Sequence, residues 1–151
     1  ELQNKLESTE LSRSVGLLFV GNNDDRETTL RVLEKLRWHG PVLNLAGQTS
    51  IYESVFALSK CKAFLGNDSG LTHVSEGVGT PVTMLFGPTI ESFGFGPHLR
   101  HSQAYSSNIG CRPCSKHGDK SCRFKDMLCF ESINTEPVVA HLCKNLGLLN
   151  T

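Results

Sequence analysis

The first part of the chain alternates between short apolar runs and longer stretches with helical spacing of apolar residues. Four apolar runs have the length of a strand, and each ends at a glycine or a polar turn. They cover residues 15–20, 42–46, 62–66 and 82–87. Because these runs are apolar almost throughout, they predict a parallel sheet that is covered by helices on both faces.

Three helices are predicted between these strands, beginning at Glu27, Ile51 and Leu71. Thr49 or Ser50 is expected to cap the second one. The apolar positions expected to face inward are Leu30, Leu33, Leu36 and Trp38 in the first helix and Ile51, Val55 and Leu58 in the second. The resulting β-α-β-α-β-α-β order predicts a Rossmann-like, doubly wound α/β domain.

From Gly87 onward the apolar residues lose their regular spacing, and the sequence becomes rich in Gly, Pro, Ser and His. This composition predicts loop, with one strand near residues 103–106. A last helix is expected over residues 136–147, with Pro137 tolerated in its first turn. We expect residues 1–14 to be a linker or N-terminal extension and residues 15–151 to form one domain.

Composition excludes several classes of partner. The 151 residues contain 15 Lys and Arg and 15 Asp and Glu, so no net charge would attract nucleic acid or an anionic membrane. No apolar run approaches the ~20 residues of a membrane span, and the start lacks the shape of a signal peptide. The start also lacks Met. We therefore expect a C-terminal piece of a larger protein in the reducing cytoplasm.

Three strand-to-helix loops carry candidate chemistry: "GNNDD" (21–25), "AGQTS" (46–50) and "GNDSG" (66–70). Ligands of open parallel sheets bind at this edge, and unpaired N–H groups at a helix start attract phosphate. The third loop suits a ligand with anionic and polyhydroxyl parts, such as a nucleotide sugar. On spacing alone, the alternative that residues 67–69 merely cap a short helix stands slightly ahead. His73 alone is more typical of a packed side chain than of a catalytic one.

Two other phosphate-binding motifs are absent from the sequence. "GFG" (94–96) is not a dinucleotide fingerprint, because no predicted strand precedes it and the third glycine is missing. The chain also has no G-x-x-x-x-G-K-[ST] loop, which argues against an ATPase.

A resemblance changes the balance between these interpretations. "FLGNDSGLTHVSEGVGTPVTMLFGPT" (64–89) resembles the donor-binding signature of glycosyltransferase family 9, the family of the lipopolysaccharide heptosyltransferases. The preceding "NLAGQTSIYESVFALSKCKAF" and the cysteine-containing tail are similar to the same family, so the likeness runs from about Val15 to Leu142. Leu71 and Thr72 stand where the family usually has Pro and Met, and "VSEG" (74–77) replaces small residues.

The resemblance implies the C-terminal, donor-binding half of a GT-B enzyme. The donor-binding residues it implies are Asp25 (with Asp24 as the rival), Gly47, Thr49, Asn67, Asp68, Ser69, Gly70, Leu71, Thr72, His73, Gly87 and Thr89. Asp68 would bind sugar hydroxyls or lie near the diphosphate, and the N–H groups of residues 69–72 would bind the phosphates. Asp25 would take the ribose hydroxyls, and residues 46–50 would border the nucleotide. Gly87, Pro88 and Thr89 would close the pocket.

The resemblance also implies a function for the whole enzyme. We expect transfer of a heptose or related sugar from a nucleotide sugar, foremost ADP-heptose, to a lipopolysaccharide core acceptor, without a metal or other cofactor. The general base and the acceptor site would lie in an N-terminal domain outside this chain. The chain alone would therefore bind donor without transferring sugar. We expect it at the inner face of the inner membrane, with at most peripheral membrane contact.

The cysteine segment (residues 108–131) leaves alternatives open. Cys111, Cys114, Cys122 and Cys129 are compatible with a zinc site, with reduced and partly packed thiols, or with a disulfide formed on oxidation. Rival functions are a non-catalytic nucleotide-sugar-binding module, a different GT-B transferase or an epimerase, and a zinc-stabilised interaction domain.

Overall fold

The computed structural model of the chain describes residues 15–36 and 38–149. The chain divides between Ala57 and Leu58 into two compact units, and each is described here by itself. The expected N-terminal extension, residues 1–14, lies outside the described residues. None of the helices in the described ranges has the length and apolar character needed to cross a membrane.

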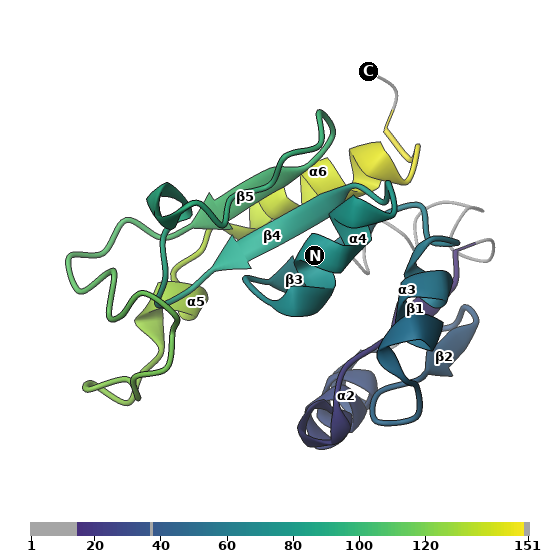
Figure 1. Cartoon of the computed structure of the whole chain (residues 1–151), viewed down its shortest axis with the longest axis horizontal. Coiled ribbons are helices and arrows are strands. Elements are labelled where there is room, and N and C mark those ends of the chain that lie inside the picture. Colours follow the sequence, from purple (N-terminus) through teal and green to yellow (C-terminus); the bar gives the residue numbers. More distant parts are fainter. Residues whose placement is uncertain (1–14, 37, 150–151) are drawn as a thin grey trace. The chain divides into compact units, whose positions relative to one another are not determined.

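The first unit is built from short parallel strands and the helices that follow them (Figure 1). Strand β1 (Leu17–Phe19) pairs in parallel with β2 (Val42–Asn44), and Leu18 lies opposite Leu43. Helix α2 (Asn23–Lys35) connects the two strands, and α3 (Ile51–Leu58) follows β2. The predicted order of elements is confirmed in this part of the chain.

Helix α2 begins four residues earlier than its predicted start at Glu27, a correction that follows from local capping. The Asn22 side chain accepts the N–H groups of Asp24 and Asp25 at 2.7 and 3.1 Å. In return, the Asp25 carboxylate accepts the Asn22 N–H at 2.9 Å, which completes a capping box. The polar run after β1 is therefore a helix start instead of a free turn.

The predicted inward faces of the first two helices are partly wrong. Leu30 and Ile51 are 48% and 55% exposed, whereas Leu58 is 1% exposed, as expected for an inward position. Thr29 is buried beside Leu30. Leu33 and Leu36 of the same predicted stripe are half-buried and share a face with Thr29, so the predicted face of α2 is inward in part and Leu30 lies at its exposed side.

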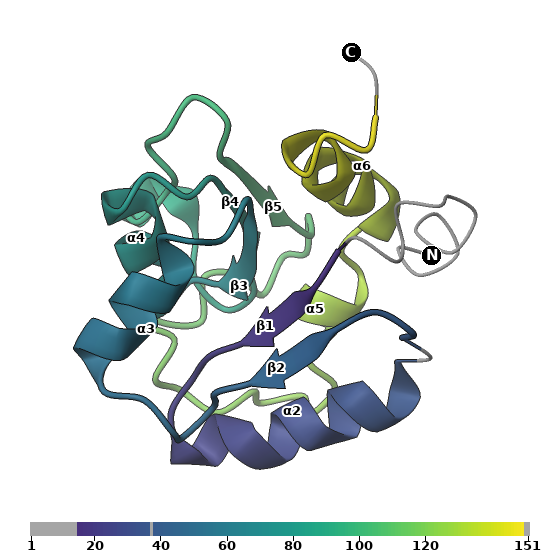
Figure 2. The same cartoon turned by 90° about the vertical axis from the view of Figure 1, so that its right-hand side faces the viewer.

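The second unit contains a three-stranded parallel sheet in the order β3-β4-β5. Its strands are β3 (Phe64–Asn67), β4 (Val82–Phe86) and β5 (Gln103–Ser106), which confirms the predicted strand near 103–106. Helices α4 (Gly70–Gly77) and α6 (Thr135–Asn145) lie on opposite sides of this sheet (Figure 2). Two short helices, η2 (Glu91–Phe93) and α5 (Leu128–Glu131), were not predicted.

Strand β4 is the centre of this unit because both of its faces are buried. Val82, Met84 and Phe86 are fully buried on one face, and Phe64, Phe95 and Ala104 pack against them. On the other face, the Thr83 hydroxyl lies 2.8 Å from Nδ1 of His141 in α6. The structure differs from the expectation of one sheet in one respect: the ladders of the described residues form a two-stranded and a three-stranded group.

Gly87, at the exit of β4, is a glycine because an aromatic ring occupies the space of a side chain. A Cβ there would lie 2.2 Å from Cε2 and Cζ of Phe130. Phe130 belongs to α5, so the close approach fixes the cysteine segment against the end of the central strand. The glycine of the "FGP" sequence at the end of β4 is thus required by packing.

We expect Gly87→Ala to lower the free energy of unfolding by about 1–3 kcal/mol, because the phenyl ring must shift to admit the methyl group. Gly77→Ala in α4 is the matched control, since a Cβ there meets nothing within 4 Å. We expect that change to be neutral or to stabilise by up to about 1 kcal/mol. Chemical denaturation measures both values, and equal values for the two variants would contradict the packing argument.

Candidate functional site

The turn between β3 and α4 is the candidate site, and its polar side chains do not cap the helix. Ser69 is the N-cap residue by position, yet its side chain makes no capping hydrogen bond. The turn is held instead by Thr72, whose buried hydroxyl donates to the Asn67 carbonyl at 2.5 Å. Asp68 donates its N–H to the Leu85 carbonyl at 3.3 Å, which joins the turn to β4.

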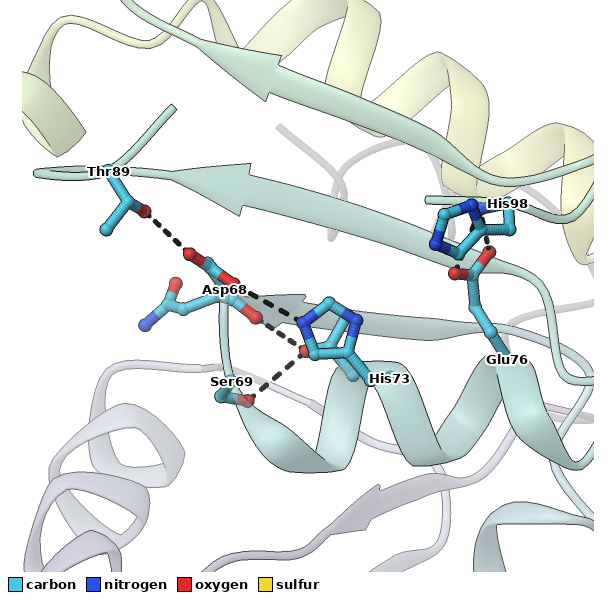
Figure 3. A network of polar contacts seen from close by, with 8 residues as sticks. Asp68, Ser69, His73, Glu76, Thr89 and His98 are labelled. Carbon is cyan, nitrogen blue, oxygen red and sulfur yellow. Dashed lines mark hydrogen bonds and ion pairs between the residues drawn. The ribbon is translucent and has the colours of Figure 1, made fainter. Parts of the chain in front are cut away.

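The Asp68 carboxylate is oriented by two other segments of the same unit (Figure 3). Its Oδ2 accepts the hydroxyl of Thr89 at 2.7 Å, and its Oδ1 lies 3.4 Å from Nε2 of His73. Thr89 is buried and follows β4, while His73 lies in the first turns of α4. The carboxylate is therefore positioned by the loop after the central strand as well as by the helix.

The first turn of α4 offers N–H groups to a ligand, although fewer than predicted. The N–H of Thr72 donates to the Ser69 carbonyl at 3.1 Å, so it is already engaged. Gly70 and Leu71 are the first two residues of the helix, and N–H groups at such positions have no acceptor within the helix. Their N–H groups and the positive end of the helix dipole favour an anion here.

A cavity of about 180 Å³ opens beside this turn. Four predicted residues line it: Asp68, Ser69, Gly70 and His73. Three residues that the sequence did not single out complete the lining, namely Phe95, Lys116 and His117. The predicted pocket-closing residues Gly87 and Thr89 are not in the lining. Thr89 acts on it through its hydrogen bond to Asp68.

Phe95 forms one wall of the cavity between two imidazole rings. Its ring centroid is 6.3 Å from that of His73 and 6.3 Å from that of His117. The loop that carries Phe95 is held by Glu76, a buried residue of α4 (Figure 3). The Glu76 carboxylate accepts the N–H groups of His98 at 3.0 Å and of Leu99 at 2.9 Å.

These contacts change the acidity of Glu76. Burial, the largest influence, would raise its pKa. Hydrogen bonds from the Leu99 N–H, the Ser102 hydroxyl and the His98 N–H outweigh burial and leave the pKa of Glu76 below its ordinary value. The carboxylate is therefore ionised at neutral pH and bonded to the loop in that form.

The predicted residues of the first unit form a group of their own. Gly47 has a φ of +69°, and its N–H donates to the Gly21 carbonyl at 3.0 Å. A Cβ on Gly47 would lie 2.4 Å from Oδ1 of Asn23, so the loops after β1 and β2 are in close contact. The Thr49 hydroxyl lies 2.9 Å from that of Ser54, whereas Ser50 forms the capping box of α3 with Glu53.

A family model for glycosyltransferase family 9 (heptosyltransferase) matches residues 4–125 of the chain. The chain belongs to this family. Its sequence is 43% identical over 87 residues to lipopolysaccharide heptosyltransferase 2 of Escherichia coli (strain K12), a match that covers 56% of this chain and 24% of that protein. It is 24% identical over 129 residues to lipooligosaccharide heptosyltransferase 2 of Campylobacter jejuni (serotype O:6). That match covers 85% of this chain and 40% of that protein.

Two solved structures share the fold of this family 9 chain. The E. coli ADP-heptose LPS heptosyltransferase II matches with a TM-score of 0.70 at 23% identity, and a family 9 glycosyltransferase of Veillonella parvula matches with 0.65 at 21%. Each match covers 95% of this chain and 40% of the other. The likeness confirms the Rossmann-like, GT-B-type α/β fold. The chain spans well under half the length of these relatives.

The departures from the family pattern have structural consequences in this chain. Thr72, which stands where the family usually has Met, is fully buried and ties the turn to Asn67. Glu76, one of the residues that replace small ones, holds the Phe95 loop. No pattern in the sequence identified Phe95, Lys116 or His117 as cavity residues, because they lie in loops without periodicity.

Within the described part of the chain, the four cysteines of residues 108–131 form no disulfide bond, and Cys129 is buried. Within the described ranges, no group of three or more His, Cys, Asp or Glu residues is arranged to hold a metal ion. Burial is the largest cause of the raised pKa of Cys129. Backbone N–H groups, that of Met127 foremost, lower the pKa of Cys122.

The Glu76 contact predicts a pH dependence of stability. The folded pKa lies below the ordinary value of 4.5, so the stabilisation is present above that value and is lost as the pH falls through the folded pKa. We expect Glu76→Gln to lower the free energy of unfolding by about 1–3 kcal/mol at pH 7. The deficit relative to wild type should shrink in acid.

Chemical denaturation across this pH range measures the effect. Glu131→Gln, which changes an exposed carboxylate of α5, is the control and should be close to neutral. A Glu76→Gln deficit that stayed constant down to the lowest pH would show that the ionised carboxylate is not what holds the Phe95 loop.

Proposed function

We propose that this chain is the donor-binding part of a heptosyltransferase that moves a heptose from ADP-heptose to a lipopolysaccharide core acceptor. Membership of family 9 and the names of the relatives support the reaction class. The observation that carries the proposal is the arrangement of the Asp68 carboxylate beside the start of α4, inside the cavity.

The two halves of the proposed donor match two kinds of group, a carboxylate in the cavity lining and the N–H groups at the start of α4. A carboxylate accepts hydrogen bonds from hydroxyls and repels phosphate, so Asp68 suits the sugar. The N–H groups of Gly70 and Leu71 suit the diphosphate. Thr89 and His73 hold the carboxylate in a fixed orientation, so little entropy is lost when the sugar binds.

The same geometry supports catalysis of glycosyl transfer. The transition state is oxocarbenium-like, and negative charge grows on the departing diphosphate as the glycosidic bond breaks. Helix N–H groups that face this charge bind it more strongly in the transition state than in the ground state, which lowers the barrier. The chain's part in the reaction is thus leaving-group stabilisation, without a metal, while the general base and the acceptor site belong to the proposed N-terminal domain.

The first unit would serve the nucleoside. Asp25 uses Oδ2 for the capping box, and its Oδ1 is the atom we propose for the ribose hydroxyls. Asp24, its rival, lies in the same first turn of α2. Gly47 and Thr49 would border the base and the ribose. We place the enzyme in the cytoplasm at the inner face of the inner membrane, where its donor and acceptor would meet.

Asp68 provides the direct test. We expect Asp68→Ala to weaken binding of ADP-heptose about tenfold or more, because a hydrogen bond to a charged group contributes about 1.5–3 kcal/mol. Binding of ADP should change less, since ADP lacks the sugar. Calorimetric titration of the chain with both ligands measures the two constants. Thr89→Val removes only the hydroxyl that orients the carboxylate. It should weaken ADP-heptose binding less than Asp68→Ala does.

The matched control is Glu136→Ala, which removes a carboxylate from the first turn of α6, outside the cavity lining. It should leave both constants unchanged. Equal weakening by Asp68→Ala and Glu136→Ala would contradict a direct role for Asp68. Failure of the wild-type chain to bind either ligand would contradict the proposed donor site.

A further inference from the structure

The cysteine segment brings two basic side chains to the cavity. Lys116 and His117 lie between Cys114 and Gly118, in the loop that follows β5, and both line the cavity together with residues of the turn at Asp68. They come from a part of the chain more than forty residues beyond the signature turn. Their placement depends on how this segment is attached to the sheet.

A single arginine makes that attachment. The Arg112 guanidinium donates hydrogen bonds to the carbonyl groups of Gly87, Thr89 and Ser107. The adjacent Cys114 N–H donates to the Pro88 carbonyl at 2.8 Å. The loop with Lys116 is thus fixed to residues 87–89, the same residues that orient Asp68 through Thr89.

Glycine permits the positive φ at which this loop turns against the exit of β4. Gly118 has a φ of +70°, and a Cβ there would lie 3.4 Å from Cγ of Pro88 and 3.5 Å from Cγ2 of Thr89. The loop therefore packs directly on the exit of β4. The positions of Lys116 and His117 are held from both sides, by Arg112 before them and by Gly118 after them.

A dianionic ligand in this cavity needs a positive charge to offset the Asp68 carboxylate. Of the described residues that line it, Asp68 is anionic, and His73 lies beside that carboxylate. A diphosphate bound at Gly70 would be repelled by Asp68. Lys116 is the lining residue with a permanent positive charge, and no hydrogen bond or ion pair joins it to another described residue.

We propose that Lys116 is a binding residue for the diphosphate of the nucleotide-sugar donor, supplied by the cysteine segment. This inference rests on the proposed function and adds a residue to it. The ammonium group offsets the charge of Asp68 and contributes a charge-assisted hydrogen bond to a phosphate oxygen. His117, with its ring beside Phe95, completes the wall that carries this cation.

The test is calorimetric titration of the chain with ADP at low and moderate salt. We expect Lys116→Gln to weaken ADP binding about tenfold, the scale of one charge-assisted hydrogen bond, and Lys116→Arg to restore most of it. The wild-type affinity should fall with salt more steeply than that of Lys116→Gln, because one charge contact is missing in the variant. A purely structural role would not change this salt dependence.

Lys120→Gln is the matched control, because Lys120 lies in the same segment outside the cavity lining. If wild type binds ADP and Lys116→Gln binds it equally well, or no more weakly than Lys120→Gln, the inference fails while the proposed donor site stands. If wild type binds neither ADP nor ADP-heptose, the donor site and the inference fail together. An unchanged denaturation profile of Lys116→Gln confirms that the loss is not one of folding.

Discussion

The hydrogen bond from the Thr89 hydroxyl to the Asp68 carboxylate is the contact on which the second unit's site depends. It joins the end of β3 to the exit of β4 at 2.7 Å, and Thr89 is buried. A buried hydroxyl without a partner is unfavourable, so the bond holds the carboxylate in one orientation. The carboxylate then lines the cavity at the start of α4, where it lies beside the first N–H groups of the helix.

Two charged side chains build the remaining walls in the same way. Glu76 accepts N–H groups of the loop after Phe95, and Arg112 donates to carbonyl groups around the exit of β4. In both cases a charge is satisfied by the backbone of a loop that has no periodic structure of its own. One irregular loop is thereby fixed to α4 and the other to the exit of β4, and each brings a side chain to the cavity. Loops held on a rigid scaffold commonly carry binding residues in this manner.

The order of elements and the signature turn could be predicted because they are local properties. Apolar runs that end at a glycine or a polar turn located β1, β2, β3 and β4, and "GNDSG" marked the turn beside which the cavity lies. The start of α2 was missed because Asn22 and Asp25 are typical of turns as well as of a capping box. The outward position of Ile51 was missed because an apolar stripe does not say which side of a helix is covered.

The walls of the cavity could not be predicted from the sequence, because they depend on contacts between distant segments. Phe95 reaches the cavity through Glu76, and Lys116 through Arg112; neither pair has a characteristic spacing. Asp68, Ser69, Gly70 and His73, which the family resemblance singled out as donor-binding residues, line the cavity, and their binding role stays a prediction. The resemblance also assigned phosphate binding to Thr72, whose N–H is engaged within the turn. Which N–H groups of a turn are already hydrogen-bonded depends on its three-dimensional structure and not on residue type.

The most direct measurement is a backbone amide NMR titration of the chain with ADP. We expect saturable shifts concentrated at Gly70 and Leu71, with smaller changes at Thr72, whose N–H is already hydrogen-bonded. Shifts confined to other parts of the chain, or no saturable shifts at all, would contradict the claim that the start of α4 is an anion site for a nucleotide-sugar donor.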